Sequence, residues 1–460
     1  MQTNIRLDDG FSLDLTNMTA QTIGEGVTPQ DLLEMAGKAT EALSTLARIR
    51  EGEVQPHGEQ VKFMHLPYPD AGIVDVAKIT SWADNLVGEF DAVVSIGIGG
   101  SYLGNKTIQE ALAHPYFNEL SAKGRGGRPK LYFAGQNLDP ANLRGLLDVI
   151  DVGRTMFVLI SKSGDTVEPM SAFMACYDLV KQSGHNPARH FTAITDASKG
   201  LLKEIADREG MDTFVVPAGV GGRWSVMSDV GLVTAAAAGI DISAMLAGAR
   251  AMDQACQATG PESNPALAYA LFHHILDKKY SKIISVIMPY VTALKSLGEW
   301  YVQLLAESLG KKMNRQGQVV HEGRTPIPAV GTTDMHAQTQ QHREGKNIRA
   351  LTFIRVDDFG SGEIILPDGF KDVPQLGYLC GHPMSRSLYA ALTANETSLA
   401  EAGRPNCRLS IPALTPYTLG QLFFFFEMAT AFEGELLNVN AYDQPGVEAY
   451  KKIMKQILRP

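Results

Sequence analysis

A short segment of the chain combines the residue types that bind a phosphate group without a metal ion. Residues 161–166 read Ser-Lys-Ser-Gly-Asp-Thr and follow the apolar run 155–160, which predicts a buried strand. A helix is expected shortly after this segment. Hydroxyl groups and the backbone N–H groups at a helix N-terminus together favour an anion. The segment therefore indicates a phosphorylated small molecule as ligand.

A glycine-rich segment, Gly97–Gly104, follows another predicted strand. It reads Gly-Ile-Gly-Gly-Ser-Tyr-Leu-Gly, and a dinucleotide fingerprint would need glycine at Tyr102, so we reject nucleotide binding. Glycines at a strand–helix turn also serve simple chain reversal, and that alternative stays open for this segment alone. Open α/β sheets bind ligands at the carboxyl ends of their strands, where Ser101 would add a hydroxyl near the anion.

An arginine and a glutamate stand in contexts that favour catalysis. Arg223 lies among the glycines of residues 219–225, which let the backbone pass close to a ligand. It could stabilise an oxygen that becomes negative during a reaction, or it could pair with a surface carboxylate. Glu307 lies near the end of the predicted helix 297–309. It could be a buried general base or a helix-face charge beside Lys311.

The remaining candidates are a histidine and two C-terminal polar residues. His336 is a candidate for proton transfer, because histidine is the residue type most suited to exchange a proton near neutral pH. Its spacing from His342 puts the two rings on no common helix face, so we expect no metal site. Gln444 and Lys451 are seven residues apart and could share one helix face. A lone C-terminal lysine is more usually solvated.

Short apolar strands that alternate with helices predict the elements that position these residues. Such a pattern is typical of parallel sheets with helices on both faces. It restarts after about residue 240, with predicted strands at 283–288, 348–356 and 408–411. The fold class expected is therefore α/β, with two αβα sandwiches and mainly parallel sheets. The strands predicted before the restart are residues 91–96, 130–134, 155–160, 191–195 and 213–216.

The expected domain organisation follows the same pattern. A helical N-terminal segment, residues 1–56, would pack on the second sandwich. The first sandwich would comprise residues 57–240 and the second residues 241–440, and a C-terminal helix would lie in residues 441–460.

Composition limits the possible partners. The chain has 460 residues and a formal net charge of -9, so no bulk positive field attracts nucleic acid. No apolar stretch approaches the roughly 18 residues of a membrane span, and the run 422–426 is expected to be a buried helix segment. The N-terminus lacks the pattern of a signal peptide. The four cysteines have no CxxC spacing, which favours reduced thiols and a cytoplasmic location.

Taken together and in this order, the motifs resemble the glucose-6-phosphate isomerase family. The resemblance runs from about residue 90 to the C-terminus. It is most specific at Gly-Gly-Arg-Trp-Ser, residues 221–225, and at Tyr-Asp-Gln-Pro-Gly-Val-Glu-Ala-Tyr-Lys, residues 442–451. It implies two sugar-isomerase (SIS) domains of the αβα type, in agreement with the pattern of strands.

The resemblance also implies a role for each candidate residue. Glu307 matches the base, Arg223 the group that stabilises the enediolate, and His336 and Lys451 the groups that open the sugar ring. It implies no metal and no cofactor, and a homodimer in which His336 comes from the neighbouring subunit. The substrate-binding positions that it implies are Gly100, Ser101, Ser161, Lys162, Ser163, Thr166 and Gln444.

The reaction implied is the reversible conversion of glucose 6-phosphate to fructose 6-phosphate in glycolysis and gluconeogenesis. Two alternatives stay open. A SIS protein can bind a sugar phosphate as a regulator without catalysis, and an isomerase of this type can also accept mannose 6-phosphate.

Two positions depart from the pattern of the family. Asp165 stands where the phosphate loop usually has threonine, and Trp224 where phenylalanine or tyrosine is common. A carboxylate repels a phosphate dianion, so we expect Asp165 to point away from the ligand or at a backbone N–H. Another large aromatic at 224 is expected to be tolerated.

Overall fold

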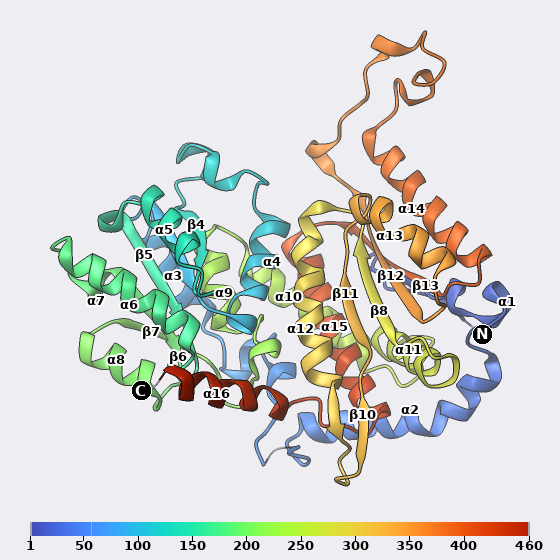
Figure 1. The fold of residues 1–460 in the computed structure, drawn as a ribbon, viewed down its shortest axis with the longest axis horizontal. Coiled ribbons are helices and arrows are strands. Elements are labelled where there is room, and N and C mark those ends of the chain that lie inside the picture. Colours follow the sequence, from blue (N-terminus) through green and yellow to red (C-terminus); the bar gives the residue numbers. More distant parts are fainter. Residues whose placement is uncertain (1, 57, 459–460) are drawn as a thin grey trace.

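The computed structural model describes residues 2–56 and 58–458, which form two α/β lobes side by side (Figure 1). The first lobe is built on a five-stranded parallel sheet in the order β4-β3-β5-β6-β7. All five strands predicted for this part of the chain are present. Their bounds are Ala92–Ile96 (β3), Lys130–Ala134 (β4), Thr155–Ile160 (β5), Phe191–Thr195 (β6) and Asp212–Val215 (β7).

Helices cover both faces of the first sheet, because its central strand is apolar on both sides. Phe157 and Leu159 of β5 pack with residues of α5, α6 and α8, whereas Met156 and Val158 belong to the core on the opposite face, with α3, α4 and α9. The helices of this lobe are α3 (Val76–Asn85), α4 (Leu103–Leu112), α5 (Pro140–Val149), α6 (Val167–Gln182), α7 (Pro187–His190), α8 (Leu201–Glu209) and α9 (Asp229–Ala237).

The second lobe contains a six-stranded sheet in the order β1-β2-β13-β12-β8-β11. Strands β13, β12, β8 and β11 run parallel to one another, and β2 pairs with β13 in the antiparallel direction. The N-terminal segment, predicted to be helical, therefore also adds two strands to this sheet. The bounds are Asn4–Arg6 (β1), Ser12–Asp14 (β2), Ile284–Pro289 (β8), Thr325–Pro328 (β11), Arg349–Asp358 (β12) and Asn406–Ala413 (β13), with a separate hairpin of Lys311–Met313 (β9) and Val319–Glu322 (β10).

Helices also cover both faces of the second sheet. α13 and α14 pack on one face, while α11, α12 and α15 contribute to the large core on the other. The predicted buried run 422–426 lies within α15, where its side chains are fully buried. No helix among the described residues is long and apolar enough to cross a membrane. The helices are α10 (Ile242–Cys256), α11 (Pro265–Tyr280), α12 (Lys295–Leu309), α13 (Thr333–Glu344), α14 (Met384–Glu401) and α15 (Pro416–Leu436).

The N-terminal end of the chain packs on the second lobe, whereas the C-terminal end runs from the second lobe to the first. The long helix α2 (Pro29–Arg50), preceded by α1 (Ala20–Ile23), packs against α11 and α15 of the second lobe. The C-terminal helix α16 (Glu448–Leu458) leaves the second lobe and lies along the first lobe, near the carboxyl ends of its strands (Figure 1). The division of the chain at residues 56, 240 and 440 stays a prediction.

Candidate active site

The segment 161–166, called the phosphate loop from here on, turns tightly between β5 and α6. The Ser161 hydroxyl accepts a hydrogen bond from the N–H of Gly164 at 3.0 Å. Gly164 has a positive φ of 73°, and a Cβ there would lie 2.2 Å from the backbone nitrogen of Leu202. Thr166 precedes α6, and its described side chain does not cap the helix. The amino end of α6 therefore keeps N–H groups available for an anion.

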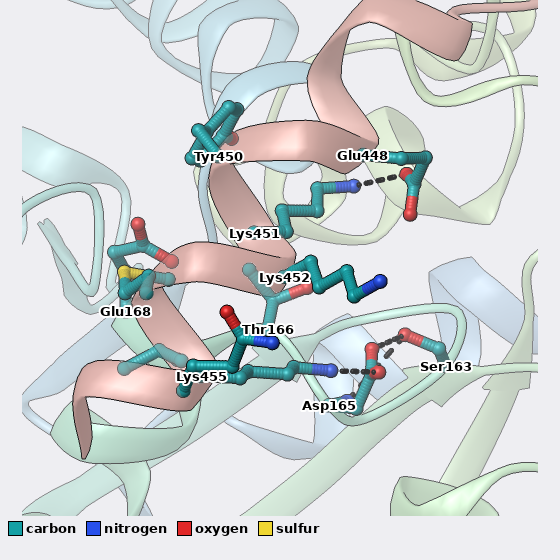
Figure 2. Close-up of a pocket in the computed structure, with 12 residues that line it drawn as sticks. Ser163, Asp165, Thr166, Glu168, Glu448, Tyr450, Lys451, Lys452 and Lys455 are labelled. Atoms are coloured by element: carbon teal, nitrogen blue, oxygen red, sulfur yellow. Dashed lines mark hydrogen bonds and ion pairs between the residues drawn. The ribbon is translucent and has the colours of Figure 1, made fainter. Parts of the chain in front are cut away.

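A cavity of about 580 Å³ opens at the phosphate loop, between α6 and α16. Figure 2 shows the loop on one side and lysines of α16 on the other. The cavity therefore joins hydroxyls, helix N–H groups and ammonium groups, which is the donor set that a phosphate requires. The loop and lysine residues that line it are Ser163, Asp165, Thr166, Lys451, Lys452 and Lys455.

Asp165 does not turn away from this cavity. Its carboxylate accepts hydrogen bonds from the Ser163 hydroxyl and from the Lys455 ammonium, the latter at 2.6 Å (Figure 2). Lys455 and then Ser163 hold the pKa of the Asp165 carboxyl below its usual value. Its negative charge is therefore paired before any ligand arrives.

Arg223 is buried, with 2 % of its surface exposed, so it is not one half of a surface ion pair. It lies in a short 3₁₀ turn, Gly222–Trp224, and its guanidinium donates to Ser308 Oγ (2.7 Å) and to the carbonyl oxygens of Ala441 (2.6 Å) and Asp443 (3.0 Å). Burial lowers the pKa of Arg223, and Glu307 opposes that shift. These three partners fix the plane of the guanidinium.

The remaining nitrogen of Arg223 faces two other predicted site residues. Nη1 donates to Gln444 Oε1 at 2.9 Å and to Glu307 Oε2 at 3.2 Å. Gln303, one turn before Glu307 on α12, donates to Glu307 Oε1 at 3.0 Å. The Glu307 side chain keeps 30 % of its surface exposed. A carboxylate held by two donors and still open to solvent is suited to exchange a proton with a bound ligand.

Lys311 does not act as the helix-face partner of the Glu307 carboxylate. Its ammonium donates instead to the backbone carbonyl oxygens of Glu307 and Asp443, the latter at 2.7 Å. Burial, followed by the nearby Arg223 charge, lowers the pKa of Lys311 to about 8. The interpretation of Glu307 as a solvated helix charge is therefore not supported by the contacts.

The segment Gly97–Gly104 touches the Arg223 turn directly. Gly100 lies against it so closely that a Cβ at this position would come within 2.0 Å of the Gly222 carbonyl oxygen. A Cβ on the neighbouring Gly99 would meet Gln303 Nε2 at 2.8 Å. This segment thus does more than reverse the chain, because it sets the position of the turn that carries Arg223.

Replacing Gly100 with alanine is expected to displace the Arg223 turn. The new Cβ would clash with the carbonyl oxygen of Gly222, and neither atom can move without a shift of the backbone. We expect a loss of about 1–3 kcal/mol in the free energy of unfolding, as in other overpacked sites, and a lower turnover number. Chemical denaturation and steady-state kinetics measure these effects. Gly145→Ala, within α5 and with no atom near its Cβ position, is the control and is expected to be neutral or stabilising. Unchanged stability and turnover in Gly100→Ala would contradict the argument.

The sequence profile of the phosphoglucose isomerase family matches residues 73–367 and 384–460. The glucose-6-phosphate isomerase of Carboxydothermus hydrogenoformans is 40% identical over 418 residues, which cover 90% of this chain and 88% of the relative. The chain belongs to the phosphoglucose isomerase family. The glucose-6-phosphate isomerase of Rubrobacter xylanophilus is 39% identical and covers 93% of this chain and 94% of the relative.

Solved structures of similar proteins show the same fold. A hypothetical protein from Thermus thermophilus superposes with a TM-score of 0.85 at 32% identity, over 98% of this chain and 100% of that chain. A glucose-6-phosphate isomerase from Chlamydia trachomatis superposes with a TM-score of 0.83 at 23% identity, over 99% of this chain and 89% of that chain. The two-lobed arrangement is therefore a property of this isomerase fold.

Two of the predicted catalytic residues lie apart from the Arg223–Glu307 pair. Lys451 lines the phosphate cavity from α16, where it donates to Glu448 at 3.0 Å. His336 lies on α13 in the second lobe, far from α16 in Figure 1, and no hydrogen bond or ion pair within the described residues joins it to Glu307 or Lys451. A single subunit therefore forms two groups of predicted residues. Arg223 contacts Glu307 and Gln444 in one group. In the other, Ser163, Thr166 and Lys451 line the phosphate cavity. His336 belongs to neither group.

The sequence interpretation missed three residues that contact the predicted ones. Gln303 holds Glu307, Ser308 holds Arg223, and Lys455 holds Asp165. Gln303 and Lys455 each lie four residues from a predicted site residue on a helix, so they share its face, and that spacing was the available signal. Trp224, the second departure, is buried and packs against Phe63.

Proposed function

We propose that this protein is a glucose-6-phosphate isomerase that interconverts glucose 6-phosphate and fructose 6-phosphate in glycolysis and gluconeogenesis. The observation that carries the proposal is the contact between Glu307 and the buried Arg223, in a chain that aligns over most of its length with relatives of that name. A regulator that only binds a sugar phosphate needs the phosphate loop but has no use for this pair.

In the proposed mechanism, one group of residues binds the phosphate of the substrate and another acts on its reacting carbons. The phosphate is bound by Ser161, Lys162, Ser163 and Thr166, with Gly100 and Ser101 beside them, and acts as a handle that fixes the reacting carbons. His336 and Lys451 move a proton between the ring oxygen and the anomeric hydroxyl, which opens the ring.

Proton transfer then follows on the open-chain sugar. Glu307 takes the proton from C2 and returns it to C1 through a cis-enediolate, and one carboxylate serves both carbons because they are adjacent on one face. Arg223 stabilises the oxygen that becomes negative, and its fixed guanidinium needs no rearrangement during the step. Gln444 holds the same guanidinium nitrogen beside the substrate.

A coupled assay tests the proposal. Fructose 6-phosphate is supplied to the purified full chain, and the glucose 6-phosphate formed is oxidised by an added dehydrogenase and read as NADPH. Steady formation supports the isomerase. Binding of the sugar phosphate without turnover would favour the regulator instead. Mannose 6-phosphate is then supplied in place of fructose 6-phosphate, with the dehydrogenase as the only added enzyme. Formation of NADPH would mean that the protein also accepts this epimer.

We further propose that the active unit is a cytoplasmic homodimer in which His336 completes the site of the partner subunit. Its support is the position of His336 on α13 and an exposed apolar segment between β12 and α14, which extends away from both lobes in Figure 1. The buried thiols Cys176, Cys256 and Cys407 suit a reducing compartment. The exposed apolar side chains of the segment are Ile364, Ile365, Phe370, Leu376 and Tyr378.

Mixing two inactive variants tests the shared site. Glu307→Gln and His336→Ala are each expected to be inactive, and a hybrid dimer has one site that contains both native residues. Random reassortment is expected to restore about a quarter of wild-type activity, since half of the dimers carry one intact site of two. Failure of this mixture to regain activity would contradict a shared site.

The control for this experiment mixes Glu307→Gln with Arg223→Ala. These two residues contact each other within one subunit, so each site of a hybrid dimer would still lack one of them. No activity is therefore expected to return in the control mixture. Equal restoration in both mixtures would mean that the gain does not come from sharing His336.

A further inference from the structure

The C-terminal helix α16 is weakly attached to the rest of the molecule. None of its described residues is buried, and its apolar side chains Tyr450, Ile453 and Ile457 are more than half exposed. Apolar packing therefore contributes little to its position. Among the hydrogen bonds and ion pairs of the described residues, the one that joins α16 to another element is the contact between Lys455 and Asp165, at 2.6 Å.

This contact lies in the phosphate cavity and on the same helix face as Lys451. Lys451 and Lys455 are four residues apart, so their side chains leave α16 one above the other, and both line the cavity. Figure 2 shows the two ammonium groups on the side of the helix that faces the phosphate loop. Within the described part of the chain, the hydrogen bond that Lys451 donates goes to Glu448 of the same helix. Whatever fixes α16 near Asp165 therefore also fixes the Lys451 ammonium.

We propose that Asp165 and Lys455 are positioning residues, which hold α16 against the phosphate loop and so place Lys451 in the cavity. The geometry of the pair is independent of any reaction, and only the kinetic part of its test rests on the proposed isomerase function. Asp165 acts through Lys455, and neither residue is required to exchange a proton or to form a bond with the substrate.

The same pair explains how a carboxylate is compatible with a phosphate site. Unpaired, Asp165 would repel a phosphate dianion bound by its own loop. With Lys455 beside it, the carboxylate of Asp165 is paired with a positive charge, and the Ser163 hydroxyl, which donates to Asp165 here, can turn to a phosphate oxygen. The two residues therefore differ in one respect: loss of Lys455 leaves a repulsive charge in the loop, and loss of the Asp165 charge does not.

Hydrogen exchange of the full-length protein without ligand tests the positioning directly. Asp165→Asn and Lys455→Gln are each expected to speed amide exchange in residues 448–458 about two- to five-fold, the range that a partly exposed ion pair supports. The double variant is expected to exchange no faster than either single variant, because the two changes remove one interaction. Lys455→Arg is expected to keep slow exchange. Arg189→Gln, which breaks the exposed pair with Glu89, is the control.

Equal exchange of α16 in wild type, Asp165→Asn and Lys455→Gln would overturn the proposal. So would additive effects in the double variant, since they would mean that the two side chains act separately. This measurement needs no turnover, so it stands whether or not the chain proves to be an isomerase.

Kinetics test the consequence for Lys451. Both variants are expected to lower the turnover number about two- to five-fold, because both loosen α16, but they are expected to move KM in different directions. KM for the sugar phosphate rises in Lys455→Gln and stays level or falls in Asp165→Asn. A purely structural role would not separate the two in this way. Unchanged turnover in both variants, in an enzyme that is active as wild type, would overturn the positioning of Lys451.

Discussion

Replacing Glu307 with glutamine is expected to lower the turnover number by about 10²–10⁴-fold, the contribution that a positioned general base makes. Glutamine has nearly the same shape, and its carbonyl oxygen can still accept from Arg223 Nη1 or Gln303 Nε2. It has no basic oxygen that can remove the C2 proton. Binding of a sugar-phosphate analogue that does not react is therefore expected to stay within a few-fold of wild type, which calorimetry measures alongside the isomerase assay.

The control for this variant lies on the same helix. Glu299, two turns before Glu307, pairs with Lys106 at 2.7 Å and has a similar exposed fraction of 30%. Glu299→Gln removes a charge from α12 without touching Arg223, and is expected to cost at most about 1 kcal/mol of stability and little activity. Near-normal turnover in Glu307→Gln would rule out Glu307 as the base. Equal losses in both variants would point to a general effect on α12.

The central strands of both sheets could be predicted from sequence because each is a predominantly apolar run. β5 and β8, for example, are buried almost throughout, and each has one hydroxyl residue, Thr155 or Ser285, in an otherwise apolar run. The strands that were missed are short or contain proline. β1 and β2 have three residues each, too few to show alternation, and β11 reads Thr-Pro-Ile-Pro. Proline is tolerated in β11 because it lies at the edge of the sheet.

The sequence allowed us to predict which residues belong to the candidate site, but not which of them contact one another. Arg223 and Glu307 are 84 residues apart in sequence, and Asp165 and Lys455 are 290 apart, so no local pattern connects either pair. Local spacing was even misleading for Lys311. Its position four residues after Glu307 indicated an ion pair on the helix surface, yet α12 ends at Leu309 and Lys311 turns inward to two backbone carbonyls. Helix spacing predicts a neighbour only while the helix continues.

Replacing Arg223 with alanine is expected to reduce both catalysis and stability, because one buried side chain serves both. Removal of a preorganised donor from a developing oxyanion typically costs about 10²–10³-fold in turnover. The change also leaves Ser308 Oγ and the carbonyl oxygens of Ala441 and Asp443 without their donor, which is expected to cost about 1–3 kcal/mol in the free energy of unfolding. Turnover per folded molecule, with denaturation curves for each variant, separates the two effects.

Arg223→Lys distinguishes charge from geometry at this position. Lysine keeps the positive charge but has a single ammonium group in place of the guanidinium fork. That group cannot reach all of the acceptors of Arg223 from one position, namely Ser308 Oγ, Glu307 Oε2 and the carbonyl oxygens of Ala441 and Asp443. If charge alone stabilises the intermediate, this variant regains most of the turnover lost in Arg223→Ala. If the fixed orientation matters, as the five hydrogen bonds of Arg223 indicate, turnover stays low. A variant that raises KM with an unchanged turnover number would instead mean that Arg223 binds substrate and transition state equally.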